Sequence, residues 1–308
     1  MKNFRNIIFV LVISTFVLVM IKQDSQKEVV SSKPIVSIST FSLYDIAKHI
    51  AGDSVELVMI LPFGVDPHSF EPTPKLMAKI SESSLVVYSG AGLEPWTDGF
   101  DFRGKVIDMS KYVKLRKLGL HHDEHHKEAH KLGSVDPHYW LDISNMILVT
   151  NLMVNEFIKI SPKNKELYLK NQNNYIKSLK KLDNDYRKTL STCQGDTIIV
   201  NHNAFSYMAN NYHFHVEALS GLSPEAQPSA KKMIELVEHV KEHNISTVFF
   251  ESFVSDKAIK SIASEAKVSV DILQPLGNIT ADEAKQNLSF EDIMRRNLKK
   301  IAKALKCH

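Results

Sequence analysis

The chain has 308 residues, of which 44% are hydrophobic and 24% are charged. This composition excludes a mainly disordered protein and supplies enough apolar side chains for about two domains of ordinary size. The formal net charge is only +3, and removal of the first 22 residues would leave equal numbers of basic and acidic residues. Nucleic-acid binding depends on a basic surplus, so we expect no nucleic-acid partner.

The first 22 residues have the pattern of an export segment. Lys2 and Arg5 precede an apolar run from Ile7 to Ile21, and a polar stretch begins at Lys22. A run of about 15 apolar residues is shorter than the ~20 that cross a bilayer comfortably, which favours a signal peptide. An uncleaved N-terminal anchor stays open, because no Ala-x-Ala pattern marks a cleavage site. We therefore expect a periplasmic or otherwise exported protein. We also expect a monomer.

The cysteine content fits an oxidising compartment. The chain has two cysteines, Cys193 and Cys307, and an even number in an exported chain favours a disulfide between them. The alternative is a pair of unrelated buried thiols. Neither cysteine lies near the end of the apolar run, so that region offers no acceptor for a lipid.

Strand and helix patterns alternate along most of the chain. In the first half, strands are predicted at residues 34–39, 54–61 and 84–89, with helices at residues 44–51 and 74–81. In the second half, strands are predicted at residues 197–200, 215–219, 247–251 and 268–273, with helices at residues 229–242 and 256–265. Such alternation predicts parallel sheets flanked by helices, and its two blocks predict an α/β protein of two lobes.

A long amphipathic helix is predicted between the two blocks. Residues 162–190 contain no glycine, and their apolar positions recur at intervals of three, four and seven, which is the period of a helix. We expect one rigid helix at residues 161–192 that joins an N-terminal lobe, residues 34–160, to a C-terminal lobe, residues 193–308.

Three histidines far apart in the sequence are candidate metal ligands. His68 and His138 each end an Asp-Pro-His tripeptide, and His202 follows the predicted strand 197–200. Neutral imidazole is a common ligand for transition metals, and a preceding proline limits the freedom of the chain. Ligands of open parallel sheets bind beyond the carboxyl ends of the strands, which is where His68 and His202 fall. Helix capping by His68, or an ordinary core or surface role for His202, is the alternative.

A histidine-rich segment lies between the first two candidates. Residues 121–130 contain five histidines within the predicted loop 120–131. Several pairs are four residues apart, so a transient helix would present chelating pairs and could collect metal weakly. Copper or nickel would bind there as well, so the segment cannot set specificity. A solvated loop without a role is the alternative.

Residues 34–308 resemble the metal-binding lipoprotein and periplasmic components of ABC importers for zinc and manganese. Six segments carry the resemblance in order: Gly64 to Pro74, Asp136 to Asp142, His202 to Tyr207, Leu222 to Ser229, Phe249 to Ser255, and Leu273 to Gly277. The resemblance implies two α/β lobes joined by a rigid helix, with the metal held between them. It also implies that the protein delivers the ion to an inner-membrane ABC permease.

The family's first three ligands fall on His68, His138 and His202. Manganese-type members of the family have a glutamate at the third ligand position. The histidine at that position in this chain, His202, therefore favours Zn²⁺ over Mn²⁺. Many relatives have aspartate where Gln274 stands, and glutamine is a weaker ligand. The fourth ligand is therefore open between Gln274, Asp271, Glu251 and a water. Glu251 is favoured as a hydrogen-bond partner that orients a histidine.

Two other classes of function remain in competition with metal transport. Three histidines with an open fourth position also describe a catalytic zinc that activates water. The chain has no His-Glu-x-x-His motif and no acid directly before a candidate ligand, so we expect no enzyme. A metal-dependent surface adhesin is the other alternative.

Overall fold

The computed structural model describes residues 33–100, 102–117, 135–222, 229–252 and 256–308. The expected signal or anchor at residues 1–22 and the histidine-rich loop at residues 120–131 lie outside these ranges. Among the described residues, every helix is too short or too polar to span a membrane.

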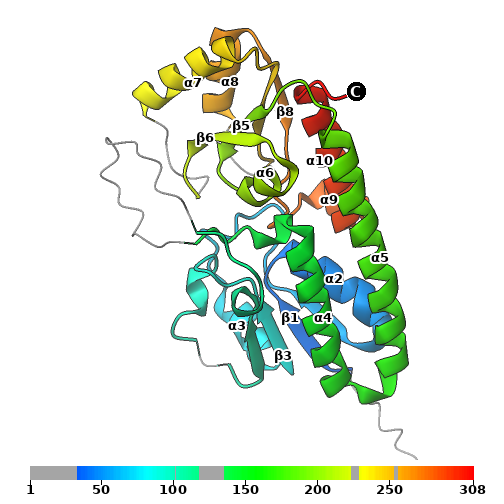
Figure 1. Cartoon of the computed structure of the whole chain (residues 1–308). Coiled ribbons are helices and arrows are strands. Elements are labelled where there is room, and N and C mark those ends of the chain that lie inside the picture. The colour runs from blue at the N-terminus through cyan, green and yellow to red at the C-terminus, as the bar shows by residue number, and fades with distance from the viewer. Residues whose placement is uncertain (1–32, 101, 118–134, 223–228, 253–255) are drawn as a thin grey trace, which may run out of the picture. The chain divides into compact units, whose positions relative to one another are not determined.

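Residues 34–308 contain two parallel four-stranded sheets, as the alternating pattern predicts (Figure 1). The first sheet has the order β2-β1-β3-β4 and is built from β1 (Ile35–Ile38), β2 (Glu56–Met59), β3 (Leu85–Tyr88) and β4 (Lys105–Asp108). The second sheet has the order β6-β5-β7-β8 and is built from β5 (Thr197–His202), β6 (His215–Ser220), β7 (Thr247–Phe250) and β8 (Ser269–Ile272). Strand β4 was not expected from the sequence.

Alternation along the strands sends side chains to two different cores. In β3, Leu85 and Val87 join the main core, which includes α2 (Phe41–Ala51) and α4 (Ile143–Ile160). Val86 points to the other face and meets Ile80 of α3 (Pro74–Ser81). This period of two is the reason that helices cover both faces of the sheet.

The second sheet is covered in the same way. Ile199 of β5 packs with α7 (Ala230–Glu242) and α8 (Lys257–Ala266). Its neighbours Ile198 and Val200 join the main core on the opposite face. The remaining helices are α5 (Lys165–Leu190), α6 (Ser206–Tyr212), α9 (Ala281–Lys285) and α10 (Phe290–Ala304).

The long helix α5 has 26 residues and follows a short 3₁₀ turn at Pro162–Asn164. At 1.5 Å per residue it is about 39 Å long. Its buried side chains are the apolar positions that the sequence pattern selects: Tyr168, Tyr175, Leu179, Leu182, Tyr186 and Leu190. The helix runs beside α2 and α4 at one end and beside α10 at the other, so a single stripe contacts elements from both halves of the chain (Figure 1).

Cys193 and Cys307 form a disulfide, as expected. It ties the residues just after α5 to the residues just after α10. The backbone N–H of Gly195 also donates to the carbonyl of Leu305 at 2.9 Å, so the two segments are held by more than the covalent bond.

Replacing both cysteines by serine should lower the free energy of unfolding by about 4 to 5 kcal/mol, because the disulfide closes a loop of 114 residues in the unfolded chain. Urea unfolding of the oxidised protein and of the double variant measures the difference. A loss below about 1 kcal/mol would contradict the chain-entropy explanation.

Candidate metal centre

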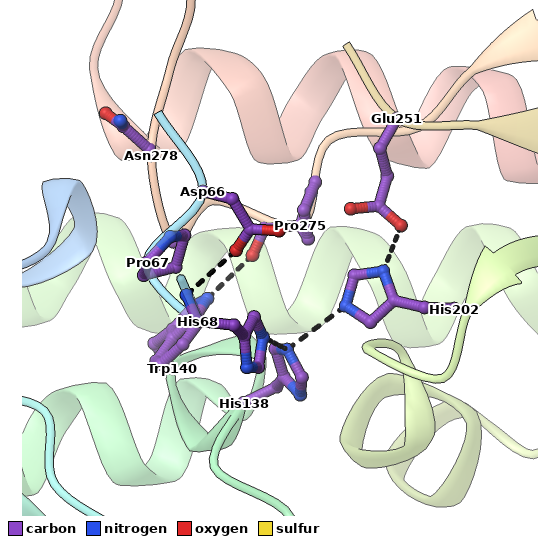
Figure 2. Close-up of a pocket in the computed structure, with 10 residues that line it drawn as sticks. Asp66, Pro67, His68, His138, Trp140, His202, Glu251, Pro275 and Asn278 are labelled. Atoms are coloured by element: carbon purple, nitrogen blue, oxygen red, sulfur yellow. Dashed lines mark hydrogen bonds and ion pairs between the residues drawn. The ribbon is translucent and has the colours of Figure 1, made fainter. Parts of the chain in front are cut away.

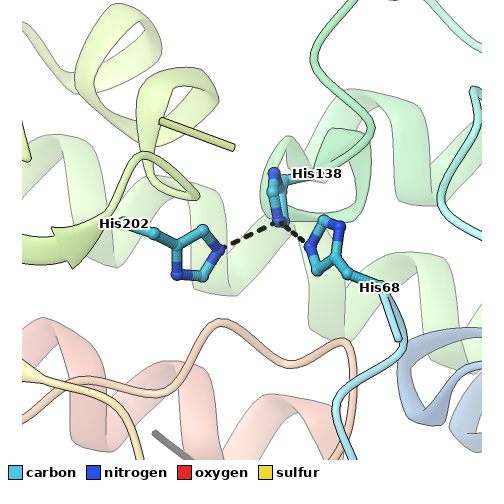
Figure 3. Close-up of side chains that lie close together, drawn as sticks. All are labelled: His68, His138 and His202. Carbon is cyan, nitrogen blue, oxygen red and sulfur yellow. Dashed lines mark hydrogen bonds between the residues drawn. The ribbon is translucent and has the colours of Figure 1, made fainter. Parts of the chain in front are cut away.

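The three histidines expected from the sequence converge in the structure (Figure 3). The Nε2 atom of His138 lies 3.4 Å from Nε2 of His68 and 3.3 Å from Nε2 of His202. One ligand atom from each ring lies within 4.8 Å of the other two. His138 and His202 are each only 2% exposed.

These separations match the geometry of a tetrahedral zinc ion. Two nitrogens that are each about 2.05 Å from such an ion lie about 3.35 Å apart. The two measured separations, 3.4 Å and 3.3 Å, agree with this value. His138 is therefore spaced from each of the other two rings as two ligands of one cation would be.

The repeated Asp-Pro-His tripeptide explains how His68 and His138 are presented. In both copies the aspartate Oδ1 accepts the backbone N–H of the histidine two residues later, at 2.9 Å. The intervening proline fixes one backbone angle of the turn. His202 reaches the site differently, because it is the last residue of β5 and stands at the carboxyl end of a central strand.

Two carboxylates form hydrogen bonds with the Nδ1 atoms, here called the outer nitrogens, of two of the rings. Asp136 Oδ1 lies 2.8 Å from Nδ1 of His138, and Glu251 Oε1 forms a short hydrogen bond with Nδ1 of His202 (Figure 2). A carboxylate at Nδ1 favours the tautomer with a proton there, which leaves the lone pair of Nε2 for a metal ion. Asp136 also accepts the hydroxyl of Ser206, so α6 contributes to the orientation of His138.

The electrostatics of the site differ from one histidine to another. Burial lowers the pKa of His68 to about 2, and the charges that His138 and His202 can carry add to the effect. Burial also acts to lower the pKa of His202, but the charge and hydrogen bond of Glu251 outweigh it, so this pKa is raised. Burial acts to raise the pKa of Asp136, whereas its hydrogen bond with His138 and the charge on that ring lower it overall.

The protein candidates for the fourth ligand differ in the contacts that their side chains make. Asp271 forms an ion pair with Lys300 at 2.9 Å, and the amide nitrogen of Gln274 donates to Glu283 at 2.7 Å. Glu251 contacts the outer nitrogen of His202, which is the orienting role that the sequence favoured. Glu251 also lines the pocket, but its carboxylate does not group with the three ring nitrogens within 4.8 Å. The side-chain oxygen of Gln274 is buried and has no hydrogen-bond partner among the residues that the structure describes, so Gln274, Glu251 and a water all stay candidates for the fourth ligand.

Several residues around the site were given no role of their own by sequence reasoning, and Asn278 lay outside every motif. The pocket is also lined by Asp66, Trp140, Pro275, Gly277 and Asn278 (Figure 2). The orienting role of Asp136 could have been inferred from the repeated tripeptide. The indication from the sequence that residues 275–278 line the pocket was weaker, because the family-like segment Leu273 to Gly277 includes only part of this stretch.

The fold and the site together define a two-lobed protein with a pocket lined by three histidines. The family of the periplasmic zinc-uptake complex component A, ZnuA, matches residues 36–304. The chain belongs to this family.

Individual relatives agree with this assignment. The chain is 31% identical over 292 residues to the zinc-binding protein AdcA of Streptococcus pyogenes, covering 89% of this chain and 57% of AdcA. It is 31% identical over 273 residues to the high-affinity zinc uptake system protein ZnuA of Bacillus subtilis, covering 86% of this chain and 85% of that protein. The chain thus spans a little over half the length of the AdcA relatives.

The same architecture occurs in a solved structure. The Zn(II)-bound ZnuA-like domain of Streptococcus pneumoniae AdcA superposes with a TM-score of 0.74 at 30% sequence identity. The match covers 89% of this chain and 99% of that domain. Two parallel sheets flanked by helices and joined through a long helix are therefore the fold of the family.

Zinc binding should weaken as the pH falls, because a proton competes with the ion for Nε2 of His202. The pKa of this ring is raised, so competition begins above its ordinary value of 6.5. His68, with its pKa lowered to about 2, adds no competing proton above about pH 3. In Glu251→Gln the loss of the carboxylate should lower the pKa of His202, so that the decline begins at a lower pH.

Competition titrations with a zinc chelator between pH 5.5 and 8 measure this dependence for both proteins. Glu251→Gln should also bind zinc roughly 10- to 100-fold more weakly at pH 8, because the ring is no longer oriented. An identical pH profile in the two proteins would contradict the role assigned to Glu251.

Proposed function

We propose that this protein is the zinc-binding solute-binding component of an ABC importer, which captures one ion at His68, His138 and His202 and delivers it to a membrane permease. The observation that carries the proposal is the convergence of three histidine nitrogens within 4.8 Å of one another, with Nε2 of His138 at 3.4 Å and 3.3 Å from those of His68 and His202, close to the separation of two ligands on a tetrahedral ion. Membership of the zinc-uptake family and the similarity to zinc-binding relatives give further support.

Zinc is favoured over manganese by the donor atoms. Among the described residues, the one cluster of potential ligands within 4.8 Å consists of three imidazoles. Imidazole suits zinc, whereas manganese favours carboxylate and carbonyl oxygen. Asp136 and Glu251 bind the outer ring nitrogens of His138 and His202, so they increase the basicity of these ligands and partly balance the charge of the ion.

Capture between two lobes follows from the origin of the ligands. His68 and His138 belong to the proposed N-terminal lobe, residues 34–160, and His202 to the proposed C-terminal lobe, residues 193–308, with residues 161–192 as the linker helix. Loss of the ion removes the attraction that holds the two groups of ligands together. A permease that contacts both lobes can therefore distinguish the loaded protein from the empty one, and we expect an exported protein that works beside a membrane.

A hydrolytic role is less well supported by the same contacts. A general base must reach a water on the metal ion. Asp136 and Glu251 are engaged at Nδ1 of His138 and of His202, whereas the Nε2 atoms of these rings approach one another. This arrangement suits orientation of ligands for binding and release.

His138→Ala should abolish tight zinc binding, because it removes the central nitrogen of the three. Calorimetry with zinc, and competition between zinc and manganese in the unaltered protein, measure affinity and preference. His243→Ala is the matched control, since His243 is exposed at the end of α7, and it should bind zinc as the unaltered protein does. Retained nanomolar affinity in His138→Ala, or a preference for manganese, would contradict the proposal.

The histidine-rich segment is proposed to collect ions weakly for the main site. Its flanks are joined by a β-bridge between Lys117 and Val135, and the backbone N–H of Asp136 donates to Arg116 at 2.9 Å. A short linker can therefore replace residues 118–134 without moving these flanks. A protein with Gly-Gly-Ser in their place should lose weak zinc equivalents and keep the tight one.

Calorimetric titration counts both classes of site. A variant with serine at the five histidines of residues 121–130 keeps the length of the loop and is the control for effects of shortening. Loss of the tight site in the serine variant would contradict the division between a collecting segment and a binding site.

A further inference from the structure

The segment Pro275–Ile279 connects the second sheet to the loops that carry the first two histidines. It follows β8, and its residues are all buried. Three hydrogen bonds join its backbone to the first half of the chain. Trp140 Nε1 donates to the carbonyl of Pro275 at 2.7 Å. The backbone N–H of Phe41 donates to Gly277 at 3.0 Å, and that of Gly64 donates to Ile279 at 2.9 Å.

Asn278 makes the most specific contacts of this segment. Its side chain is 1% exposed, and its amide nitrogen donates to the carbonyls of Pro62 at 2.6 Å and Val65 at 2.8 Å. Its Oδ1 accepts the backbone N–H of Ile279 at 2.8 Å. Both hydrogens of the amide and its oxygen are thus engaged, which fixes the orientation of the side chain.

The two carbonyls that Asn278 binds are the first and last of one tight turn. The backbone N–H of Val65 donates to the carbonyl of Pro62 at 3.3 Å, and Gly64 at the third position has φ +81°. A positive φ at that position is typical of a type II turn and favours glycine. The turn leads directly into Asp66-Pro67-His68, so its position determines where the His68 ring can lie.

Gly277 lets the same segment approach both ligand loops. A Cβ at this position would lie 3.3 Å from Cγ of Pro67 and 3.3 Å from Cζ2 of Trp140. Pro67 directly precedes His68, and Trp140 follows His138 by two residues. The segment therefore packs between the supports of two different ligands, and Gly277 and Asn278 both line the metal pocket (Figure 2).

We propose that Asn278 is a positioning residue for zinc binding: it fixes the Pro62–Val65 turn to the second half of the chain and so sets the distance from His68 to the other two histidines. The proposal rests on the function proposed above. Asp136 supports the ring of His138, and Glu251 supports the ring of His202. In the proposal, the neutral amide of Asn278 has the corresponding supporting role for His68. A tetrahedral site depends on ring placement within about 0.5 Å, so a loosened turn weakens binding.

Asn278→Ala removes both donors to the turn, and Asn278→Asp also places a charge against the two carbonyls. We expect the zinc dissociation constant to rise about tenfold in Asn278→Ala and further in Asn278→Asp, within the range found when supporting partners of metal ligands are removed. Chelator competition measures the affinity. The visible absorption spectrum of cobalt-loaded protein reports coordination geometry, and it should change in both variants, which a loss of stability alone would not produce.

Asn287→Ala is the matched control. Asn287 also joins the two halves of the chain, because its Oδ1 accepts Lys48 Nζ at 2.6 Å, but this contact is exposed and does not line the pocket. Its zinc affinity should stay within about twofold of the unaltered protein, with the same cobalt spectrum. If Asn278→Ala does not fold, Asn278→Ser, which keeps one donor and one acceptor, replaces it with the same expectations.

Two outcomes separate the inference from the function on which it rests. An unaltered affinity and cobalt spectrum in a folded Asn278 variant would overturn the positioning role while leaving zinc binding intact. Failure of the unaltered protein to bind zinc tightly would instead overturn the proposed function.

Discussion

The convergence of three imidazoles in one buried pocket is the constraint on which the rest of this structure depends. Ring nitrogens 3.3 to 3.4 Å apart cannot all carry protons without strong repulsion. The protein resolves this by burial, which lowers the pKa of His68, and by carboxylates that hold protons on the outer nitrogens of His138 and His202. We propose that the lone pairs left at the centre bind a divalent cation.

Parallel sheets make this convergence attainable from distant parts of the chain. The carboxyl ends of parallel strands lie at one edge of a sheet, and loops from that edge can reach a common pocket. His202 ends β5, and the His68 loop follows β2. The helix α5 then connects the two halves of the chain through its buried stripe of side chains. The segment Pro275–Ile279 connects them through backbone hydrogen bonds.

Much of this was accessible from the sequence for identifiable reasons. The helical period of residues 162–190 predicted the buried face of α5, because a helix of that length repeats its pattern many times. The repeated Asp-Pro-His tripeptide predicted His68 and His138, because the same local turn produces the same presentation. Strand β4 was missed, because four residues give too short a pattern to distinguish a strand from a loop.

The sequence by itself determined much of the local geometry: most of the strands, the buried side chains of α5, and the histidines that stand at turns and strand ends. Only the tertiary structure decided how those parts meet. It selected Glu251 as the partner of His202, engaged Asp271 with Lys300, and brought Asn278 to the turn before His68. The physical reason is that periodicity and turn chemistry act over a few residues, whereas these contacts join segments tens to hundreds of residues apart and arise from the packing of the two sheets.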